Sequence, residues 1–344
     1  MKHITRLIIS LLIIPVSSSV IAGRWQALPE TAPAPADNPT TVEKVLLGKT
    51  LFFDPRISST GTISCNSCHN VMAGGDDNRS VSMGVYGKTG GRSAPTVWNA
   101  AFYSSQFWDG RANTLEDQAT GPMTNPVEMG MKDHDAVITR LKSIPGYKPM
   151  FYSAFGNNDM SIDQVAKAIA AYERTLITPN SAYDKFVKGN TRALTAEQQK
   201  GMKLFAETGC TSCHSGPAFN GQHDVATGIP VLMKFPVIKG SHFIEQYDLM
   251  ADKGREELTK RRSDAHMFRV PTLRNIALTA PYFHNGRVNE LGTAVKIMAK
   301  TQLNQDLKTA EVKLIVAFLN SLSGEFPEQS LPRLPTTENT TLLH

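Results

Sequence analysis

Two copies of one short cysteine motif constrain this chain more than any other feature. In residues 65–69 and again in residues 210–214, two residues separate a pair of cysteines and a histidine directly follows the second cysteine. A disulfide framework does not need that histidine, and neither does a thioredoxin-like redox pair. Cys-x-x-Cys-His is the attachment signature of c-type haem, so the sequence predicts two covalently bound haem c groups. The chain has four cysteines in all, and the predicted attachment residues are Cys65, Cys68, Cys210 and Cys213.

Zinc binding is the main alternative use of paired cysteines. A single copy of the motif in an exported protein could be a chance match or half of a zinc site. Two copies with matching flanks argue against zinc, because the four thiolates of one site would not each need a following histidine.

Length and composition set the broad class. The chain has 344 residues, of which 41% are hydrophobic and 19% charged, an ordinary balance for a globular protein. At roughly 150 residues per domain, this length predicts about two domains. The formal net charge is +5, and the basic residues form no run long enough to follow a phosphate backbone. We therefore expect no nucleic-acid partner.

The first residues have the layout of a secretory signal peptide. Lys2 and Arg6 precede an uncharged apolar run at residues 7–16, and small residues follow it. An uncleaved membrane anchor is the alternative, but the run is short for a bilayer span. We expect residues 1–22 to be removed on export to the periplasm, which also suits haem c attachment outside the cytoplasmic membrane. Residues 23–41 read as a flexible lead-in, because they are rich in Pro, Ala and Thr.

The two cysteine motifs have repeated surroundings. Gly48 begins Gly-Lys-Thr-Leu-Phe before the first motif, and Gly201 begins Gly-Met-Lys-Leu-Phe before the second. Residues 171–176 and 317–322 share the pattern Ala, aromatic, two variable positions, Thr or Ser, and Leu. Each half thus reads as helix, haem motif, irregular middle and helix, an order that resembles the cytochrome c fold. The sequence therefore predicts a mainly α protein of two cytochrome c-like domains, each around one haem.

Helix signals mark these modules. Ser161 with Gln164, and Thr195 with Gln198, are spaced as capping boxes at helix starts. The closing helix of each half carries an apolar stripe at helical spacing, formed by Ile162, Val165, Ile169, Tyr172 and Leu176 in the first half and by Val312, Ile315, Val316 and Leu319 in the second.

The two halves are expected to meet at a linker near residues 180–195, where Gly189 and Asn190 stand. We therefore predict a first domain at residues 42–180 and a second at residues 195–327. Residues 328–344 would form a tail.

The sixth ligand of each iron would decide what that haem does. The fifth ligands would be His69 and His214. A methionine thioether makes an electron-transfer centre, whereas an open position lets the iron bind peroxide. The sequence alone does not choose among the methionines after the second motif, since a single methionine is more often core filler. These candidates are Met233, Met250, Met267 and Met298.

The first half contains a long insert after its haem motif. Cleaving peroxide requires a proton carrier, usually a carboxylate or histidine, beside a polar neighbour. Glu128 lies in a tight loop between Pro126 and Gly130, so it could be fixed in a pocket. From spacing alone, an exposed loop carboxylate is the more common interpretation, and Trp108 would by default be a core aromatic residue.

Nearly all of residues 40–327 resembles the bacterial dihaem cytochrome c peroxidases, which share a superfamily with the MauG-type dihaem enzymes. The resemblance implies a periplasmic enzyme that reduces hydrogen peroxide to water with electrons from a small soluble cytochrome c or a copper protein. Homodimers are common in that family. The resemblance rests on both haem motifs and on residues 94–99, 106–112, 125–130, 270–275, 281–286 and 315–319.

For the first half, the resemblance implies a low-potential haem, ligated by His69, at which peroxide reacts. Glu128 would be the acid and base of that pocket, and Gln118 its polar companion. Trp108 would lie between the haems and relay electrons.

For the second half, the resemblance implies a high-potential haem ligated by His214 and Met298, which takes electrons from the donor. It also implies a calcium ion between the domains, held by the backbone carbonyls of Thr279 and Pro281.

Two positions depart from the family pattern. A family histidine usually closes the peroxide-reacting iron until the other haem is reduced, but Val85 occupies its position, and no histidine lies between His69 and His134. We therefore expect an open, high-spin haem in the oxidised enzyme and no need for reductive activation, unless a side chain such as Tyr86 replaces the histidine. Ser93 stands where the family usually has a calcium-binding Asn, which weakens the expectation of calcium.

Two other functions remain open at the level of sequence. A MauG-like enzyme would oxidise a protein side chain; such enzymes replace the axial methionine with tyrosine, so Met298 speaks against this function. A non-enzymatic electron carrier would have two six-coordinate irons, and the insert with Glu128 and Gln118 argues against it.

Overall fold

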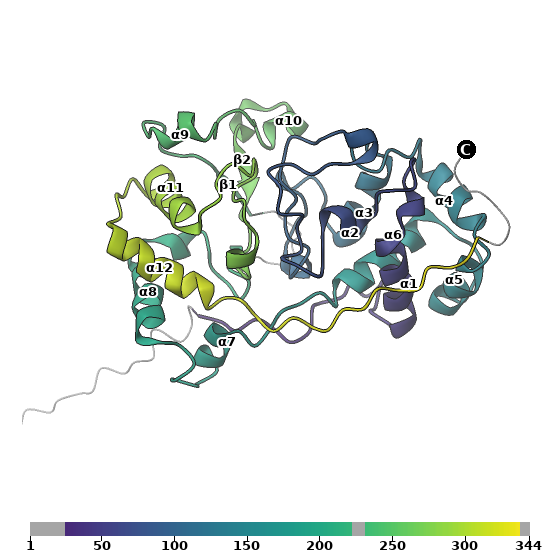
Figure 1. Ribbon diagram of the computed structural model, residues 1–344, viewed down its shortest axis with the longest axis horizontal. Helices are drawn as coiled ribbons and strands as arrows, with labels where there is room; N and C mark the ends of the chain where they lie inside the picture. Colours follow the sequence, from purple (N-terminus) through teal and green to yellow (C-terminus); the bar gives the residue numbers. More distant parts are fainter. Residues whose placement is uncertain (1–24, 222–230, 338–344) are drawn as a thin grey trace, which may run out of the picture.

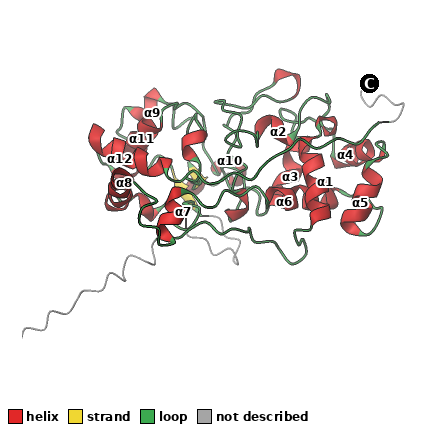
Figure 2. Cartoon of the chain, turned by 60° about the horizontal axis from the view of Figure 1, so that its bottom comes forward, coloured by secondary structure: helices red, strands yellow, loops and turns green. Residues whose placement is uncertain are grey.

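The chain is mainly helical, as predicted (Figure 2). The computed structural model describes residues 25–221 and 231–337. Within these residues the only sheet is an antiparallel pair, β1 (Leu232–Lys234) with β2 (Met267–Arg269). None of the helices in this part of the chain combines the length and apolar character needed to cross a bilayer. The predicted signal peptide lies outside the described residues, as does the end of the predicted tail.

Helices of the two halves occupy opposite ends of the molecule, with long loops between them (Figure 1). The first half contains α1 (Val42–Phe53), α2 (Cys65–Cys68), α3 (Leu115–Thr124), α4 (His134–Lys142), α5 (Tyr147–Phe155) and α6 (Ile162–Glu173). The second half contains α7 (Ala182–Val187), α8 (Ala196–Glu207), α9 (Phe243–Gln246), α10 (Glu256–Thr259), α11 (Leu291–Leu303) and α12 (Thr309–Asn320). Short 3₁₀ turns are η2 (Pro55–Ile57), η3 (Val85–Gly87), η4 (Ala100–Phe102), η5 (Cys210–Ser212), η6 (Arg262–Asp264) and η7 (Ile276–Leu278).

In each half, two long helices cross at a glycine. Helix α1 packs against α6, and α8 packs against α12. A Cβ atom on Gly48 would lie 1.8 Å from the carbonyl oxygen of Ala168, and one on Gly201 would lie 1.9 Å from that of Leu314. The backbones can approach this closely only because both positions lack a side chain. This contact explains why glycine begins both sequence repeats.

We expect Gly201→Ala to lower the free energy of unfolding by about 2–3 kcal/mol, because the added methyl group would push α8 away from α12. Denaturant unfolding of the haem-loaded protein measures the change. Gly292→Ala in α11 is the matched control, since its Cβ would meet its nearest neighbour at an ordinary 3.4 Å. Equal stability of the two variants would contradict the close helix crossing.

The helix starts confirm their sequence signals, and three positions of the predicted stripe are buried on α6, whereas Ile162 is only half-buried and Leu176 lies beyond the end of the helix. Capping boxes begin α6 at Ser161 and α8 at Thr195. The prediction for α12 is wrong at one position, because Val316 is only half-buried and Phe318 is fully buried instead. The Phe318 ring centroid lies 5.3 Å from that of Phe205 on α8. The face of α12 that contacts α8 therefore includes Phe318 rather than Val316.

The predicted linker and the predicted flexible lead-in are both held by contacts with the second half. Helix α7 lies within the linker region, and its Asp184 forms a fully buried ion pair with Arg274, with 2.8 Å between Oδ1 and Nη2. The backbone N–H of Leu28 in the lead-in donates to the same carboxylate at 2.8 Å. A buried charge pair is tolerated only when its remaining hydrogen-bonding capacity is satisfied, and the lead-in supplies one of those bonds.

The two halves meet symmetrically at Thr178. Asn99 and Asn275 each stand three residues after a Pro-Thr pair, and both adopt left-handed backbone conformations with φ of 63° and 59°. Their Nδ2 atoms both donate to Thr178 Oγ1, at 2.8 and 2.9 Å. The loops that follow the two asparagines therefore have a fixed position relative to each other.

After α12 the chain runs back along the first half (Figure 1). The Phe326 ring lies 4.9 Å from the Trp98 ring, centroid to centroid. Farther on, Arg56 Nη1 donates to the carbonyl oxygen of Pro335 at 2.7 Å. The described part of the predicted tail is thus bound to the first half.

Candidate active site

The two motif histidines are held in the same way. His69 Nδ1 lies 3.0 Å from the carbonyl oxygen of Pro95, and His214 Nδ1 lies 3.0 Å from that of Phe219. Because a carbonyl oxygen only accepts, Nδ1 must carry the proton in each ring, and Nε2 keeps a free lone pair for a metal. Burial lowers the pKa of both imidazoles and so favours the neutral, ligating form. Both histidines therefore fit the predicted role of axial haem ligand.

The backbone of the two motifs also follows one pattern. The N–H of His69 donates to the carbonyl of Cys65, and the N–H of His214 to that of Cys210, both at 2.9 Å. All four cysteines are free thiols rather than disulfides. Each motif is thus a single turn with two thiols, which a haem c needs for covalent attachment, and one imidazole, which it needs as an iron ligand.

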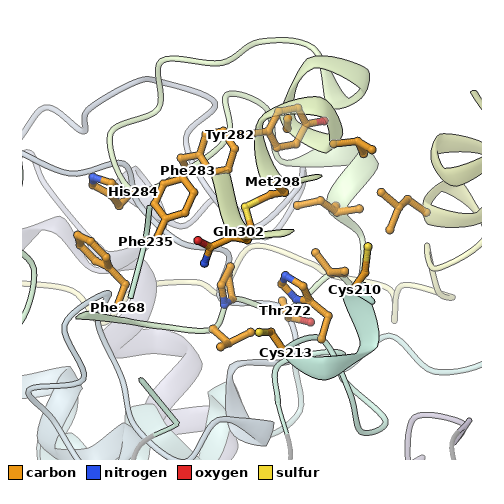
Figure 3. A pocket seen from close by; sticks show the side chains of 18 of the residues that line it. Cys210, Cys213, Phe235, Phe268, Thr272, Tyr282, Phe283, His284, Met298 and Gln302 are labelled. Atoms are coloured by element: carbon orange, nitrogen blue, oxygen red, sulfur yellow. The ribbon is translucent and has the colours of Figure 1, made fainter. Parts of the chain in front are cut away.

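A largely apolar cavity of about 210 Å³ lies beside the second motif, and we call it the His214 cavity (Figure 3). Cys210, Cys213 and His214 are among the residues that line it. Met298 on α11 points into it from another side, opposite the cysteines (Figure 3). The apolar lining, the thiols and the two candidate iron ligands fit a haem c in this cavity.

The geometry narrows the choice among the candidate methionines. In the described part of the chain, Met298 and Met233 line the His214 cavity, whereas Met250 and Met267 do not. Met233 lies on β1 and is 37% exposed, while Met298 packs against a buried cluster. Met298 is therefore the methionine best placed to face His214.

Glu128 lines a second cavity, of about 320 Å³, which we call the Glu128 cavity. Its Oε1 accepts a hydrogen bond of 3.0 Å from Asn125 Nδ2. Burial raises the pKa of the carboxyl group, and the nearby positive charge of Arg111 opposes that rise. Burial also raises the pKa of the Cys68 thiol to about 11. The structure therefore favours a fixed pocket over an exposed loop carboxylate.

Gln118 is less directly placed than Glu128. It lies on α3 and is half-buried, one turn before Pro122, which lines the Glu128 cavity. Gln118 itself is not among the described residues that line this cavity. The structure instead brings Arg111 beside Glu128, a residue that sequence reasoning missed although it closes the Trp-Asp-Gly-Arg stretch beginning at Trp108.

We expect Arg111→Ala to move the acid limb of kcat/KM for peroxide to higher pH by about 0.5–1 unit. Glu128 must be ionised to accept a proton, and loss of the cation raises its pKa further. Asp117 also lines the cavity, and its charge is unchanged in this variant. Initial rates measured from about pH 4 to about pH 8 give the midpoint of the acid limb. Arg111→Lys keeps the charge, so a limb that moved equally in both variants would contradict this electrostatic role.

The loop that lacks the family histidine packs beside Glu128. Val85 is 1% exposed, and its N–H donates to the carbonyl oxygen of Glu128 at 2.9 Å. Tyr86 is 76% exposed and Met83 is 45% exposed. The buried side chain in this loop thus has no iron-ligating atom, and the neighbours that could ligate face solvent.

Adjacent residues connect the two cavities. Phe107 lines the Glu128 cavity, and Trp108 lines the His214 cavity. The Trp108 indole Nε1 donates to the carbonyl oxygen of Ser93 at 2.9 Å. Trp108 thus lines the His214 cavity directly after a residue of the Glu128 cavity, and a hydrogen bond fixes the orientation of its ring.

Thr279 and Pro281, the predicted calcium ligands, also line the His214 cavity. The hydroxyl of Ser93 donates to the carbonyl oxygen of Arg79 at 3.2 Å. Among the described residues, no group of three or more His, Cys, Asp or Glu side chains could hold a metal ion.

A mainly helical fold with two unequal Cys-x-x-Cys-His sites is the arrangement expected of a dihaem c-type protein. The family model of the di-haem cytochrome c peroxidases matches residues 42–192. Cytochrome c551 peroxidase of Pseudomonas aeruginosa is 44% identical over 92% of this chain and 89% of its own length. Cytochrome c551 peroxidase of Nitrosomonas europaea is 41% identical over 93% of this chain and 92% of its own length. The crystal structure of a MauG-like protein associated with microbial copper homeostasis has a TM-score of 0.76 and 29% identity, with coverage of 87% of this chain and 95% of that one.

The chain belongs to the di-haem cytochrome c peroxidase family. The predicted family is thereby confirmed, and so is cytochrome-c peroxidase as the enzyme activity. Two haem c groups are the cofactors that this family implies.

Proposed function

We propose that this enzyme reduces hydrogen peroxide beside Glu128 in the first half and receives its electrons through the second half. The reaction takes one H₂O₂, two electrons and two protons to two waters. The observation that carries the proposal is the pair Phe107 and Trp108, adjacent residues that line the Glu128 cavity and the His214 cavity. When bound, the haems supply the redox equivalents and the coordination position for peroxide.

The residues around the first motif would have separate roles in ligating the iron, moving the proton and positioning the peroxide oxygens. His69, oriented through Pro95, would hold the iron from one side. Glu128, half-buried and raised in pKa, would take the proton from one peroxide oxygen and return it to the other. Gln118 on α3 would steady the oxygens, although its position one turn away makes its contribution smaller than that of Glu128.

The second half would serve electron transfer. His214 and Met298 would close the iron between them, since a methionine ligand raises the reduction potential. A small soluble cytochrome c or a copper protein would donate the electrons in a transient complex. The two halves would be cytochrome c-like domains at residues 42–180 and 195–327, and the enzyme would act in the periplasm after removal of residues 1–22. A homodimer is the expected assembly by family analogy.

The oxidised enzyme would be ready to react without prior reduction. The support for this proposal is Val85, which is buried and carries no ligating atom, together with the exposure of Met83 and Tyr86. The high-spin open haem is the property that separates this chain from family members that keep the loop histidine.

Calcium would bind weakly at the carbonyls of Thr279 and Pro281. We expect Ser93→Asn to tighten calcium binding about tenfold or more, because an amide oxygen replaces a hydroxyl that is already bonded to Arg79. Calcium titration of the haem-loaded protein, freed of metal with a chelator, measures this. Equal affinity in both proteins would remove position 93 from the calcium site.

Steady-state peroxide reduction with a reduced small cytochrome c tests the proposed function. Turnover by the fully oxidised enzyme without a pre-reduction step is the expected result. A MauG-like function is the second candidate, favoured by the missing loop histidine and the MauG-like structural relative. Oxidation of a protein side chain without consumption of the reduced cytochrome would support that function and overturn the peroxidase proposal.

A further inference from the structure

The backbone around Trp108 is held by residues of the second half. The N–H of Arg269 donates to the carbonyl oxygen of Trp108 at 2.7 Å, and its Nε donates to that of Phe107 at 3.1 Å. Arg255 Nη1 donates to the carbonyl oxygens of the next two residues, at 2.9 and 3.1 Å. Four consecutive carbonyls at residues 107–110 therefore accept hydrogen bonds from a distant part of the chain.

Arg92 joins this segment to the second half through its side chain. Its Nη1 lies 2.6 Å from Asp109 Oδ2, and its Nε lies 2.5 Å from Asp252 Oδ2. Its Nη2 lies 2.9 Å from the other oxygen of Asp252, so this pair is bidentate. The side chains of Arg92, Asp109 and Asp252 are 18%, 7% and 13% exposed, while the third partner, Glu257, is 54% exposed. Two carboxylates from separate halves are thus bridged in a largely water-excluded site, where charge-assisted hydrogen bonds are strong.

The bridge encloses the hydrogen bond that orients Trp108. Arg92 directly precedes Ser93, whose carbonyl oxygen accepts from the indole, and Asp109 directly follows Trp108. The ion pair between Arg92 and Asp109 therefore ties together the two backbone positions next to the donor and the acceptor. A shift of either strand would move the indole relative to both cavities.

We propose that Arg92 is a positioning residue for electron delivery, because its ion pairs with Asp109 and Asp252 hold the Trp108 indole between the two haem sites. The inference rests on the proposed role of Trp108 as relay. With the haems bound, the second haem would give up one electron at a time and the first haem would accept it, so each oxidation would be balanced by one reduction. Trp108 is unchanged at the end of the step, so its placement controls the rate while no bond forms or breaks.

Asp109 extends the same bridge toward the peroxide site. Both of its carboxylate oxygens lie 3.1 Å from Arg111 Nη1, and Arg111 lines the Glu128 cavity. The guanidinium carbon of Arg111 lies 3.4 Å from the centroid of the Phe107 ring. Arg92 therefore also fixes the position of the Asp109 carboxylate that binds Arg111.

Rapid mixing of the half-reduced holoenzyme with peroxide tests the proposal, with oxidation of the second haem followed by its absorption. We expect Arg92→Gln to slow this step by about tenfold or more, because a displaced relay lengthens the path. Haem loading and both reduction potentials should stay unchanged. A crystal structure of the variant should show a lengthened distance from Trp108 Nε1 to the Ser93 carbonyl oxygen. Arg287→Gln is the control, since its ion pair with Asp248 is exposed at 55% and 47%.

Asp252→Asn supplies a second, nearly isosteric variant in case Arg92→Gln does not fold, and it should slow the same step. An unchanged rate together with an unchanged indole position would overturn the inference about Arg92. Trp108→Phe separates this from the function on which it rests. If Trp108→Phe leaves the rate unchanged, the relay role itself fails. If Trp108→Phe slows the step and neither ion-pair variant does, only the positioning role fails.

Discussion

Glu128→Gln is expected to lower kcat for peroxide reduction by about 10²–10⁴-fold, the usual contribution of a positioned proton carrier. The amide keeps the size of the side chain and can keep the 3.0 Å hydrogen bond with Asn125, but it cannot accept and return a proton. Steady-state turnover with a reduced small cytochrome c measures the loss. The haem spectra of the variant should match those of the parent enzyme, because neither cysteine motif is touched.

Glu197→Gln is the matched control for this experiment. Glu197 lies in the first turn of α8 and is exposed, so the same chemical change there should leave turnover as it was. Turnover by the Glu128 variant at the parent rate would remove this carboxylate from the mechanism. The proton would then have to travel through another group of the Glu128 cavity, of which Asp117 is the acidic side chain.

Val85→His should supply the loop histidine that closes the peroxide-reacting iron in other family members and is missing from this chain. If the new imidazole closes the first iron in about 99 of 100 oxidised molecules, the reaction of the oxidised enzyme with peroxide should slow about 100-fold. Partial reduction with ascorbate should restore the rate, as reductive activation does in relatives that have the histidine. Rapid mixing of peroxide with the oxidised and the half-reduced variant measures both rates.

Val85→Leu separates ligation from a change in loop shape. Val85 is buried and its N–H is bonded to the Glu128 carbonyl, so any larger side chain will disturb the loop to some extent. The leucine variant has no ligating atom and should react without pre-reduction. If both variants lose activity and neither recovers on reduction, the effect comes from the loop and not from a new ligand.

The features that sequence predicted well are local. The two haem motifs are visible because each is a single turn, and the capping boxes at Ser161 and Thr195 are visible because each spans only four residues. The repeated flanks indicated two matching helices, and the close approach of their glycines to Ala168 and Leu314 explains why glycine begins both repeats. These patterns need no knowledge of which distant segments meet.

The features that sequence missed depend on long-range contacts. Arg92 and Asp252 are 160 positions apart, and no local pattern reports that they pair. The buried ion pair of Asp184 with Arg274 likewise anchors α7, which lies where a linker was predicted. The same carboxylate binds the lead-in to the second half. Val316 fitted the helical period of α12, but the direction from which α8 approaches buried Phe318 instead. In each case a partner from elsewhere in the chain decided the outcome.

The ligand roles lie between these two classes. Spacing could not choose among the methionines after the second motif, and the resemblance to a family selected Met298. The structure places that methionine in the His214 cavity with Cys210 and Cys213. It also places Arg111 beside Glu128, a neighbour that neither spacing nor resemblance had singled out.

Electron paramagnetic resonance of the fully oxidised, haem-loaded enzyme tests the central claim most directly, because it reports the ligation of both irons before any reduction. We expect one high-spin signal from the open first haem and one low-spin signal from the second haem with His214 and Met298. Two low-spin signals would contradict it, and would mean that a residue such as Met83 or Tyr86 closes the first iron in place of the missing histidine.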